Sequence, residues 1–177
     1  MWPLISYFWK LCTFKVGPEQ APNYPSFLLL VLSLFFVFNV FTQLAFGDDS
    51  FKWVSMDSLL LALILVFILG GLLHLFGFKH RAIATIGAFL GADTFLKLLY
   101  FPMKWVMFNS HQVQGLLEGI FLLIVLIMLC WDLAVKGHIL QRALNIGAFT
   151  AMSLAVAITL GALYCFSQLR ETVTVLL

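Results

Sequence analysis

The chain has 177 residues, of which 63% are hydrophobic and only 10% are charged, with a mean hydropathy of +1.05. A soluble domain carries roughly 25% charged residues, so this composition excludes a water-soluble fold. The formal net charge is only +2 at pH 7 and the basic residues are scattered, which argues against a nucleic-acid partner. The apolar surface is therefore expected to face lipid.

The N-terminal segment, residues 1–16, has the pattern of an amphipathic helix lying in the membrane interface. Aromatic anchors and other apolar residues gather near one helical face, as such a helix requires; they are Trp2, Ile5, Phe8, Trp9 and Cys12. Residues 17–25 hold three prolines and cannot be helical throughout. They are predicted to be a Pro-rich linker.

Five apolar runs that are long enough to cross a bilayer follow the linker. Crossing about 30 Å of hydrocarbon takes roughly 20 helical residues at a rise of about 1.5 Å per residue. The runs are residues 26–46, 58–78, 82–101, 115–131 and 142–166. The sequence thus predicts an all-α polytopic membrane protein, with a five-transmembrane-helix bundle over 26–169 and a short external tail over 170–177.

Basic residues predict how this bundle is oriented. Six of them fall on the side of the N-terminus, namely Lys10, Lys15, Lys79, Arg81, Lys136 and Arg142. Three fall on the opposite side, namely Lys52, Lys104 and Arg170. Because loops rich in Lys and Arg stay in the cytoplasm, we expect a cytoplasmic N-terminus and an external C-terminus.

Polar side chains from three predicted spans share the outer half of the bundle. They are Asn39, Gln43, Asp93, Lys97 and Glu118. Asp93 and Lys97 are four residues apart and therefore neighbours on one helical face, and Asp93 lies about 17 Å into its span. An ionisable group in a span needs a partner or a task. Two interpretations stay open: a neutralised structural network in which Glu118 also bonds Lys97, or a site that handles protons or ions.

Small residues recur at four-residue spacing in two of the spans. Gly87 and Gly91 form one such step, and Gly147, Ala151 and Ala155 form another. Stripes of small residues let helices approach closely in a membrane. We expect them to pack helices within the bundle, although they could also form a homodimer interface. Because Gly91 and Asp93 point in different directions, the third span should be central.

Motifs for catalysis or cofactor binding are missing from the chain. HExxH, a P-loop and GxGxxG are all absent, and no Ser-His-Asp or Cys-His arrangement can be assembled at one depth. Haem would need paired histidines inside the bundle, whereas only His74 lies in a predicted span. The cysteines Cys12, Cys130 and Cys165 have no metal-ligand spacing. We therefore expect no enzyme activity, no cofactor and no metal.

Two short motifs suggest a relationship. Gly17-Pro18 stands shortly before the first span, and Leu-Tyr-Phe-Pro at 99–102 ends the third. With five spans, a cytoplasmic N-terminus and a short external C-terminus, the chain resembles the Yip1-like family of small polytopic membrane proteins, in particular its compact bacterial relatives. The resemblance implies the same topology, in a bacterial inner membrane.

These observations favour a non-enzymatic inner-membrane protein that acts as a scaffold, accessory subunit or membrane-organising factor through helix–helix and lipid contacts. Its partners would be the lipid bilayer and either another membrane protein or a second copy, engaged through the small-residue stripes; nucleic acid is not expected. The alternative is a small proton- or ion-coupled transporter. In that case Asp93 would be the titrating group, and Lys97 and Glu118 would modulate it.

Overall fold

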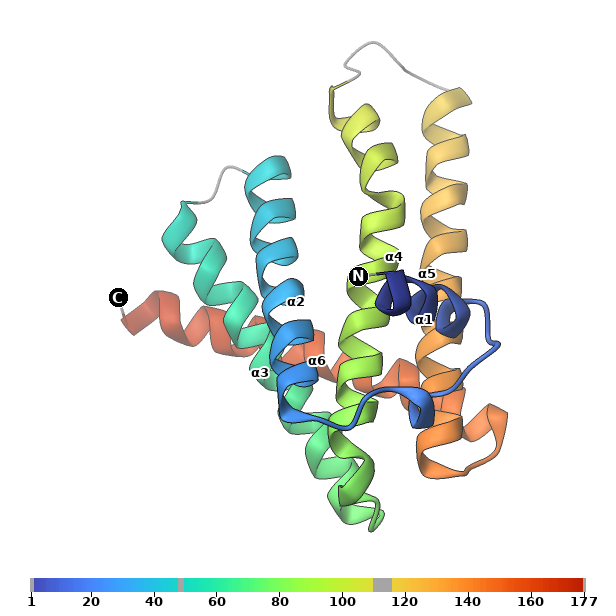
Figure 1. The fold of residues 1–177 in the computed structure, drawn as a ribbon. Coiled ribbons are helices and arrows are strands. Elements are labelled where there is room, and N and C mark those ends of the chain that lie inside the picture. Colours follow the sequence, from blue (N-terminus) through green and yellow to red (C-terminus); the bar gives the residue numbers. More distant parts are fainter. Residues whose placement is uncertain (1, 48–49, 110–115, 177) are drawn as a thin grey trace.

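The computed structural model describes residues 2–47, 50–109 and 116–176, and within them the side chains of 4–47, 50–106 and 119–171. The described residues are helical almost throughout and include no strand, which confirms the all-α prediction (Figure 1). The elements are α1 (Trp2–Cys12), η1 (Pro18–Gln20), α2 (Pro25–Phe46), α3 (Phe51–Leu75), η2 (Lys79–Arg81), α4 (Ala82–Asn109), α5 (Leu116–Leu144) and α6 (Ala148–Leu176).

Five of these helices, α2 to α6, are long and apolar enough to cross a membrane. Their outward surfaces carry large apolar side chains, as lipid-facing surfaces do. Phe67 of α3 is 83% exposed and Phe149 of α6 is 87% exposed. The structure therefore confirms the expected number of apolar helices among the described residues.

Four helices continue beyond the spans expected from hydrophobicity, among them α6, which begins at Ala148 and ends at Leu176 instead of spanning 142–166. Helix α3 begins at Phe51 rather than at residue 58, and α4 continues through Pro102 to Asn109. Helix α5 continues past Trp131 to Leu144 and therefore includes a segment predicted to be a loop. Loss of apolar character marks the edge of the hydrocarbon and not the end of a helix, because backbone hydrogen bonding continues wherever side chains permit it.

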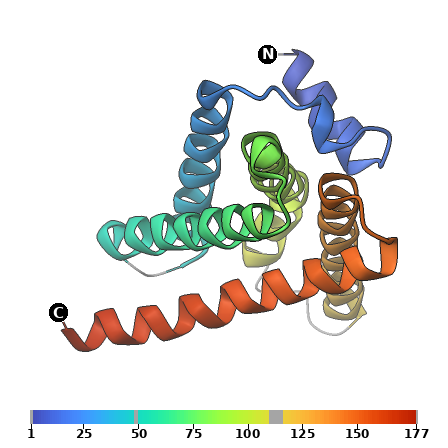
Figure 2. The ribbon, with the colours of Figure 1, turned by 90° about the horizontal axis from the view of Figure 1, so that it is seen from below.

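Helix α4 is the central element of the fold. Viewed from below, it is surrounded by α1, α2, α3 and α5 (Figure 2), and it packs against each of them. Every residue from 84 to 93 is buried. This is the place expected for the third span.

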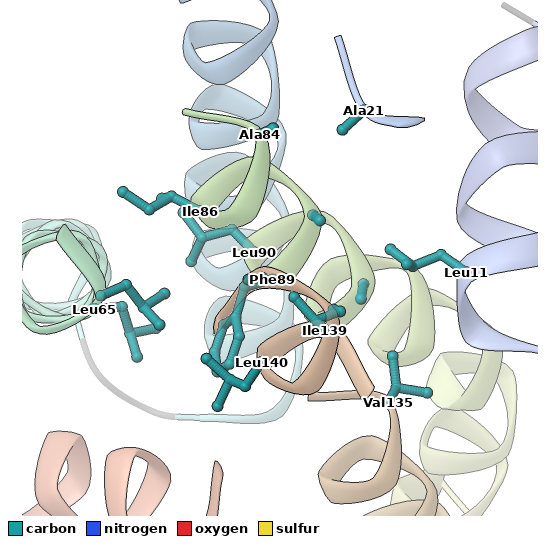
Figure 3. Packing of buried hydrophobic residues seen from close by; sticks show 14 of the residues in the cluster. Leu11, Ala21, Leu65, Ala84, Ile86, Phe89, Leu90, Val135, Ile139 and Leu140 are labelled. Atoms are coloured by element: carbon teal, nitrogen blue, oxygen red, sulfur yellow. The ribbon is translucent and has the colours of Figure 1, made fainter. Parts of the chain in front are cut away.

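The main hydrophobic core lies around the first half of α4. Side chains from α1, α3, α4 and α5 converge there (Figure 3), including Leu11, Leu65, Ile86, Phe89, Leu90, Val135, Ile139 and Leu140. Burying a side chain of this size from water is worth about 1.5–3 kcal/mol. In a membrane, where lipid is equally apolar, such a core is stabilised by close packing instead.

Helix α6 has a different direction from the rest. Figure 1 shows it crossing α3 and α5 at a steep inclination instead of running alongside α4. It approaches α5 closely at Gly137, where an added Cβ would lie 3.4 Å from the Met152 Cα. At its far end, Arg170 Nε lies 3.5 Å from Asp57 Oδ2 of α3. Like the other four apolar helices, α6 is identified as a span by its length and apolar composition.

Candidate functional site

A buried cluster of charged groups joins α4 to α5. Lys97 Nζ lies 2.6 Å from Asp93 Oδ2, and Lys136 Nζ lies 2.9 Å from Asp93 Oδ1. The same Lys136 ammonium lies 2.6 Å from Asp132 Oδ2. Two lysines and two aspartates therefore alternate in one chain of contacts, and their formal charges sum to zero. We call these four residues the ion cluster.

Helix α2 contributes a neutral amide to the ion cluster. Lys97 Nζ donates to Asn39 Oδ1 at 3.1 Å, while Asn39 Nδ2 donates to the Phe35 carbonyl at 2.7 Å. The Phe35 ring also lies under the Lys97 ammonium, 5.2 Å from its centre. The cluster thus ties three helices together, α2 to α4 through Lys97 and α4 to α5 through Lys136.

Burial makes each of these contacts important. Asp93 is 9% exposed and Lys136 is 6% exposed. Removing one partner from a buried ion pair leaves an uncompensated charge, which costs about 3–5 kcal/mol. Local geometry supports the pairing, since Asp93–Lys97 and Asp132–Lys136 are both spaced four residues apart on a helix. The bond between Lys136 and Asp93 depends on the packing of α4 against α5.

The structure brings together three of the five polar residues singled out in the sequence: Asn39, Asp93 and Lys97. Gln43 is half-buried, and no described hydrogen bond joins it to the ion cluster. The side chain of Glu118 lies outside the described residues, so the contact expected between Glu118 and Lys97 stays a prediction.

Sequence reasoning missed two members of the cluster, Lys136 and Asp132. Lys136 was expected in a cytoplasmic loop after Trp131, and this expectation is wrong because α5 continues to Leu144. The four-residue spacing of Asp132 and Lys136, followed by apolar residues, is the signal that could have found them. An oppositely charged pair one turn apart can remain in a helix where a single charge would end the span.

A cavity of about 520 Å³ adjoins the ion cluster between α4 and α5. Its walls are mainly apolar, with all four cluster residues at one end and Lys104 further along α4. The lining residues are Asp93, Leu96, Lys97, Tyr100, Met103, Lys104, Phe121, Ile124, Val125, Met128, Leu129, Asp132, Lys136 and Thr159. A cavity of this size, with charged groups at one end and apolar walls, is able to bind a small molecule.

The described part of the chain contains no candidate site for a metal ion. No group of three or more His, Cys, Asp or Glu side chains is close enough there to hold an ion. The cysteines Cys12, Cys130 and Cys165 are free.

Helix α1 is docked against α4 and α5. Phe8 lies on Gly91 of α4, Leu11 and Cys12 are buried, and the Trp131 Nε1 of α5 donates to the Cys12 carbonyl at 2.9 Å. Burial, with Asp132 nearby, raises the pKa of the Cys12 thiol to about 12. This segment is therefore an integral part of the packed core.

The buried face of α1 differs from the face expected in the sequence. Phe8 and Cys12 lie on it as expected, but Ile5 is 60% exposed and Trp9 is 50% exposed. Leu11 is buried in their place, because the residues of α1 that become buried are those that face α4 and α5. The side chain of Trp2 lies outside the described residues.

The predicted packing residues Gly87 and Gly91 accommodate aromatic rings. A Cβ at Gly87 would come within 2.6 Å of the Phe27 ring of α2, and one at Gly91 would overlap the Phe8 ring of α1. Real Cβ contacts are essentially never that close, so any larger residue forces a shift. Both glycines therefore serve contacts within the chain.

The second small-residue stripe is shorter than expected. Ala151 and Ala155 are completely buried on α6. Gly147 is exposed and precedes the helix, which begins at Ala148. The stripe is thus confined to the helix itself, because only helical spacing aligns small residues on one face.

Comparison of the chain with protein-family models, curated proteins and solved structures gives no match.

Proposed function

We propose that this is a non-enzymatic integral membrane protein of the bacterial inner membrane, acting through helix and lipid contacts as a scaffold, accessory subunit or membrane-organising factor. The observation that carries the proposal is the position of Asp93 between two lysines, at 2.6 Å and 2.9 Å. A carboxylate held this way joins helices, and neutralising it would leave two lysines with Asp132 as their one carboxylate in the ion cluster.

The arrangement of charges supports a structural role. A carrier must change the charge or contacts of its binding group during each cycle. Here Lys136 holds Asp93 and Asp132 together, so any such change would break contacts across α4 and α5. The large apolar surface outside the core makes lipid the most extensive partner of the chain.

Topology is part of the proposal. We place the N-terminus in the cytoplasm and the C-terminus outside, with α1 at the cytoplasmic boundary. Lys136 leaves the count of loop charges because it is buried, so five basic residues remain on the N-terminal side against three on the other. The same preference therefore persists. Membership of the Yip1-like family is likewise proposed, supported by Gly17-Pro18 and the motif at 99–102.

A second candidate function is a small proton- or ion-coupled transporter. The cavity beside the ion cluster favours it, because Asp93, Asp132 and Lys136 all line that space. An ion could reach these groups from one side of α4 and α5. This candidate requires the cluster to open during a transport cycle.

Flux through reconstituted vesicles separates the two functions. The wild-type chain, Asp93→Asn and a control, Asp57→Asn, would be reconstituted, and proton and sodium fluxes measured under an imposed gradient. Asp57 is a second buried aspartate, but it does not line the cavity. We expect no flux above that of empty vesicles for any of the three. A flux that Asp93→Asn abolishes and Asp57→Asn preserves would establish the transporter instead.

A further inference from the structure

Lys104 is the one lysine of the cavity that is outside the ion cluster. Its ammonium lies over the Phe46 ring, 4.5 Å from the centre. Among the described side chains, no carboxylate lies within ion-pair distance of it. Among the described residues that line the cavity, three lysines and two aspartates leave one positive charge, located at Lys104.

The size and walls of the cavity suit an amphiphile. Ligand pockets commonly measure roughly 300–1,000 Å³, and this one measures about 520 Å³. Its apolar wall includes Met103 of α4 and Phe121, Ile124 and Met128 of α5. Within a bilayer, hydrocarbon chains are the material available to fill such a space.

The position of Lys104 along α4 matches the depth of a lipid headgroup. Asp93 and Lys104 are eleven residues apart, or about 17 Å at the helical rise, and Asp93 is equally far from the start of α4 at Ala82. Lys104 thus lies about 33 Å from that end, at the far boundary of a hydrocarbon layer about 30 Å thick. From Lys104 to the ion cluster, the cavity extends over the depth of one leaflet.

From these features we infer that the cavity between α4 and α5 binds an anionic phospholipid, with its phosphate at Lys104 and an acyl chain along the apolar wall toward the ion cluster. The inference rests on the proposed function, since it names the lipid contact by its chemistry. Because the ion cluster is neutral overall, Lys104 is the described lining residue whose charge favours an anionic lipid. A basic residue near the bilayer surface contributes about 1 kcal/mol to the binding of anionic lipid.

Native mass spectrometry of the purified chain in mild detergent tests this site. Phosphatidylglycerol or phosphatidylcholine would be added and the bound lipid counted for each variant. We expect one retained phosphatidylglycerol, with binding weakened about fivefold by Lys104→Gln and largely restored by Lys104→Arg. Lys52→Gln, which removes an exposed cation of α3 outside the cavity, should bind like the wild type.

A second pair of variants tests the cavity itself. Met128→Trp fills the space between α4 and α5 and should reduce binding of both lipids. Leu126→Trp adds the same ring on the exposed outer face of α5, where Leu126 is 56% exposed, and should leave binding unchanged. Size-exclusion profiles and thermal unfolding would show that each variant is folded.

Four results would overturn the inference. One is equal retention of phosphatidylglycerol and phosphatidylcholine; another is binding that neither Lys104→Gln nor Met128→Trp changes. The third is competition by inorganic phosphate as strong as that by the lipid, and the fourth is a dimer that Met128→Trp dissociates. Each of the last two would identify a different occupant of the cavity. The mass-spectrometry assay uses no ion gradient, so it is independent of the flux measurement. A flux that depends on Asp93 would reject the proposed function and leave lipid binding undecided. Absence of lipid binding together with absence of flux would reject only the lipid site.

Discussion

The two halves of α4 differ in how closely other helices surround them. From residue 84 to 93 every position is buried, and α1, α2, α3 and α5 pack around this half. From residue 97 to 106 every position is half-buried or exposed, and the helix borders the cavity of about 520 Å³. Asp93 and Lys97 lie where one environment changes into the other.

Side-chain size explains this difference. The first half presents small residues, and rings of neighbouring helices lie directly on its backbone at Gly87 and Gly91. The second half carries bulky side chains such as Phe101 and Trp105, which pack with Phe46 at the end of α2. Small residues thus allow close packing in a membrane, whereas large ones on one side of a helix leave space on another.

The largest expected effect comes from breaking the ion cluster at the boundary of the two halves. Lys136→Ala removes the contacts to Asp93 and Asp132 together. Asp132 then loses its partner and the buried Asp93 keeps only Lys97, so we expect a loss of about 3–5 kcal/mol in the free energy of unfolding. A denaturant titration in detergent micelles measures it. Lys104→Ala is the matched control and should lower the free energy of unfolding by no more than about 1 kcal/mol. Equal losses in the two variants would contradict the role of Lys136 in joining Asp93 to Asp132.

Labelling of the Cys12 thiol measures how tightly α1 packs against the first half of α4. In a chain carrying Cys130→Ser and Cys165→Ser, we expect Cys12 to react with maleimide at pH 8 about a thousandfold more slowly than a free thiol. Burial raises its pKa from 9.0 to about 12, and only the thiolate reacts. Ser6→Cys, on the exposed side of α1, is the control and should react rapidly.

The same raised pKa predicts a pH dependence for the docking of α1. The free energy that favours docked α1 is at its full value below about pH 9 and decreases as the pH rises from 9 toward 12. In this interval the Cys12 thiol of undocked α1 loses its proton, whereas the buried thiol of docked α1 keeps it. Cys12 labelling should therefore accelerate over this interval by more than thiolate formation in a free thiol explains. Rapid labelling at neutral pH would mean that α1 is not docked.

Gly91→Ala tests the close packing of the first half of α4 by adding one carbon there. The new Cβ would overlap the Phe8 ring, so α1 must shift, at a cost of about 1–3 kcal/mol. Gly71→Ala makes the same change in α3, where an added Cβ meets nothing within 4 Å. It should be neutral or stabilise by up to about 1 kcal/mol. Thermal unfolding compares the two, and effects of the same sign would contradict the proposed contact.

The smallest expected effect concerns one hydrogen bond. Trp131→Phe keeps an aromatic ring but loses the bond from Nε1 to the Cys12 carbonyl. We expect a loss of about 0.5–1.5 kcal/mol, measured as unfolding free energy and as faster Cys12 labelling. Trp9→Phe should change labelling less, because its ring makes only an edge contact with Phe95. A larger effect at Trp9 would place the attachment of α1 elsewhere.

Much of the fold could be predicted because the information is local. A run of apolar residues forms a helix in a bilayer whatever its neighbours are, since its backbone must satisfy its own hydrogen bonds. The spacing of Asp93 and Lys97 likewise predicts their contact. The ends of α4 and α5 were less predictable, because Pro102 and Asp132 look like interruptions in the sequence but lie inside helices.

The helices, their apolar surfaces and the ion pair within α4 thus follow from local patterns along the chain. The contact of Lys136 with Asp93, the position of Phe8 on Gly91 and the cavity between α4 and α5 depend on tertiary packing. The reason is geometric. Spacing along a helix determines which side chains share a face, but which faces meet depends on how all the helices pack together.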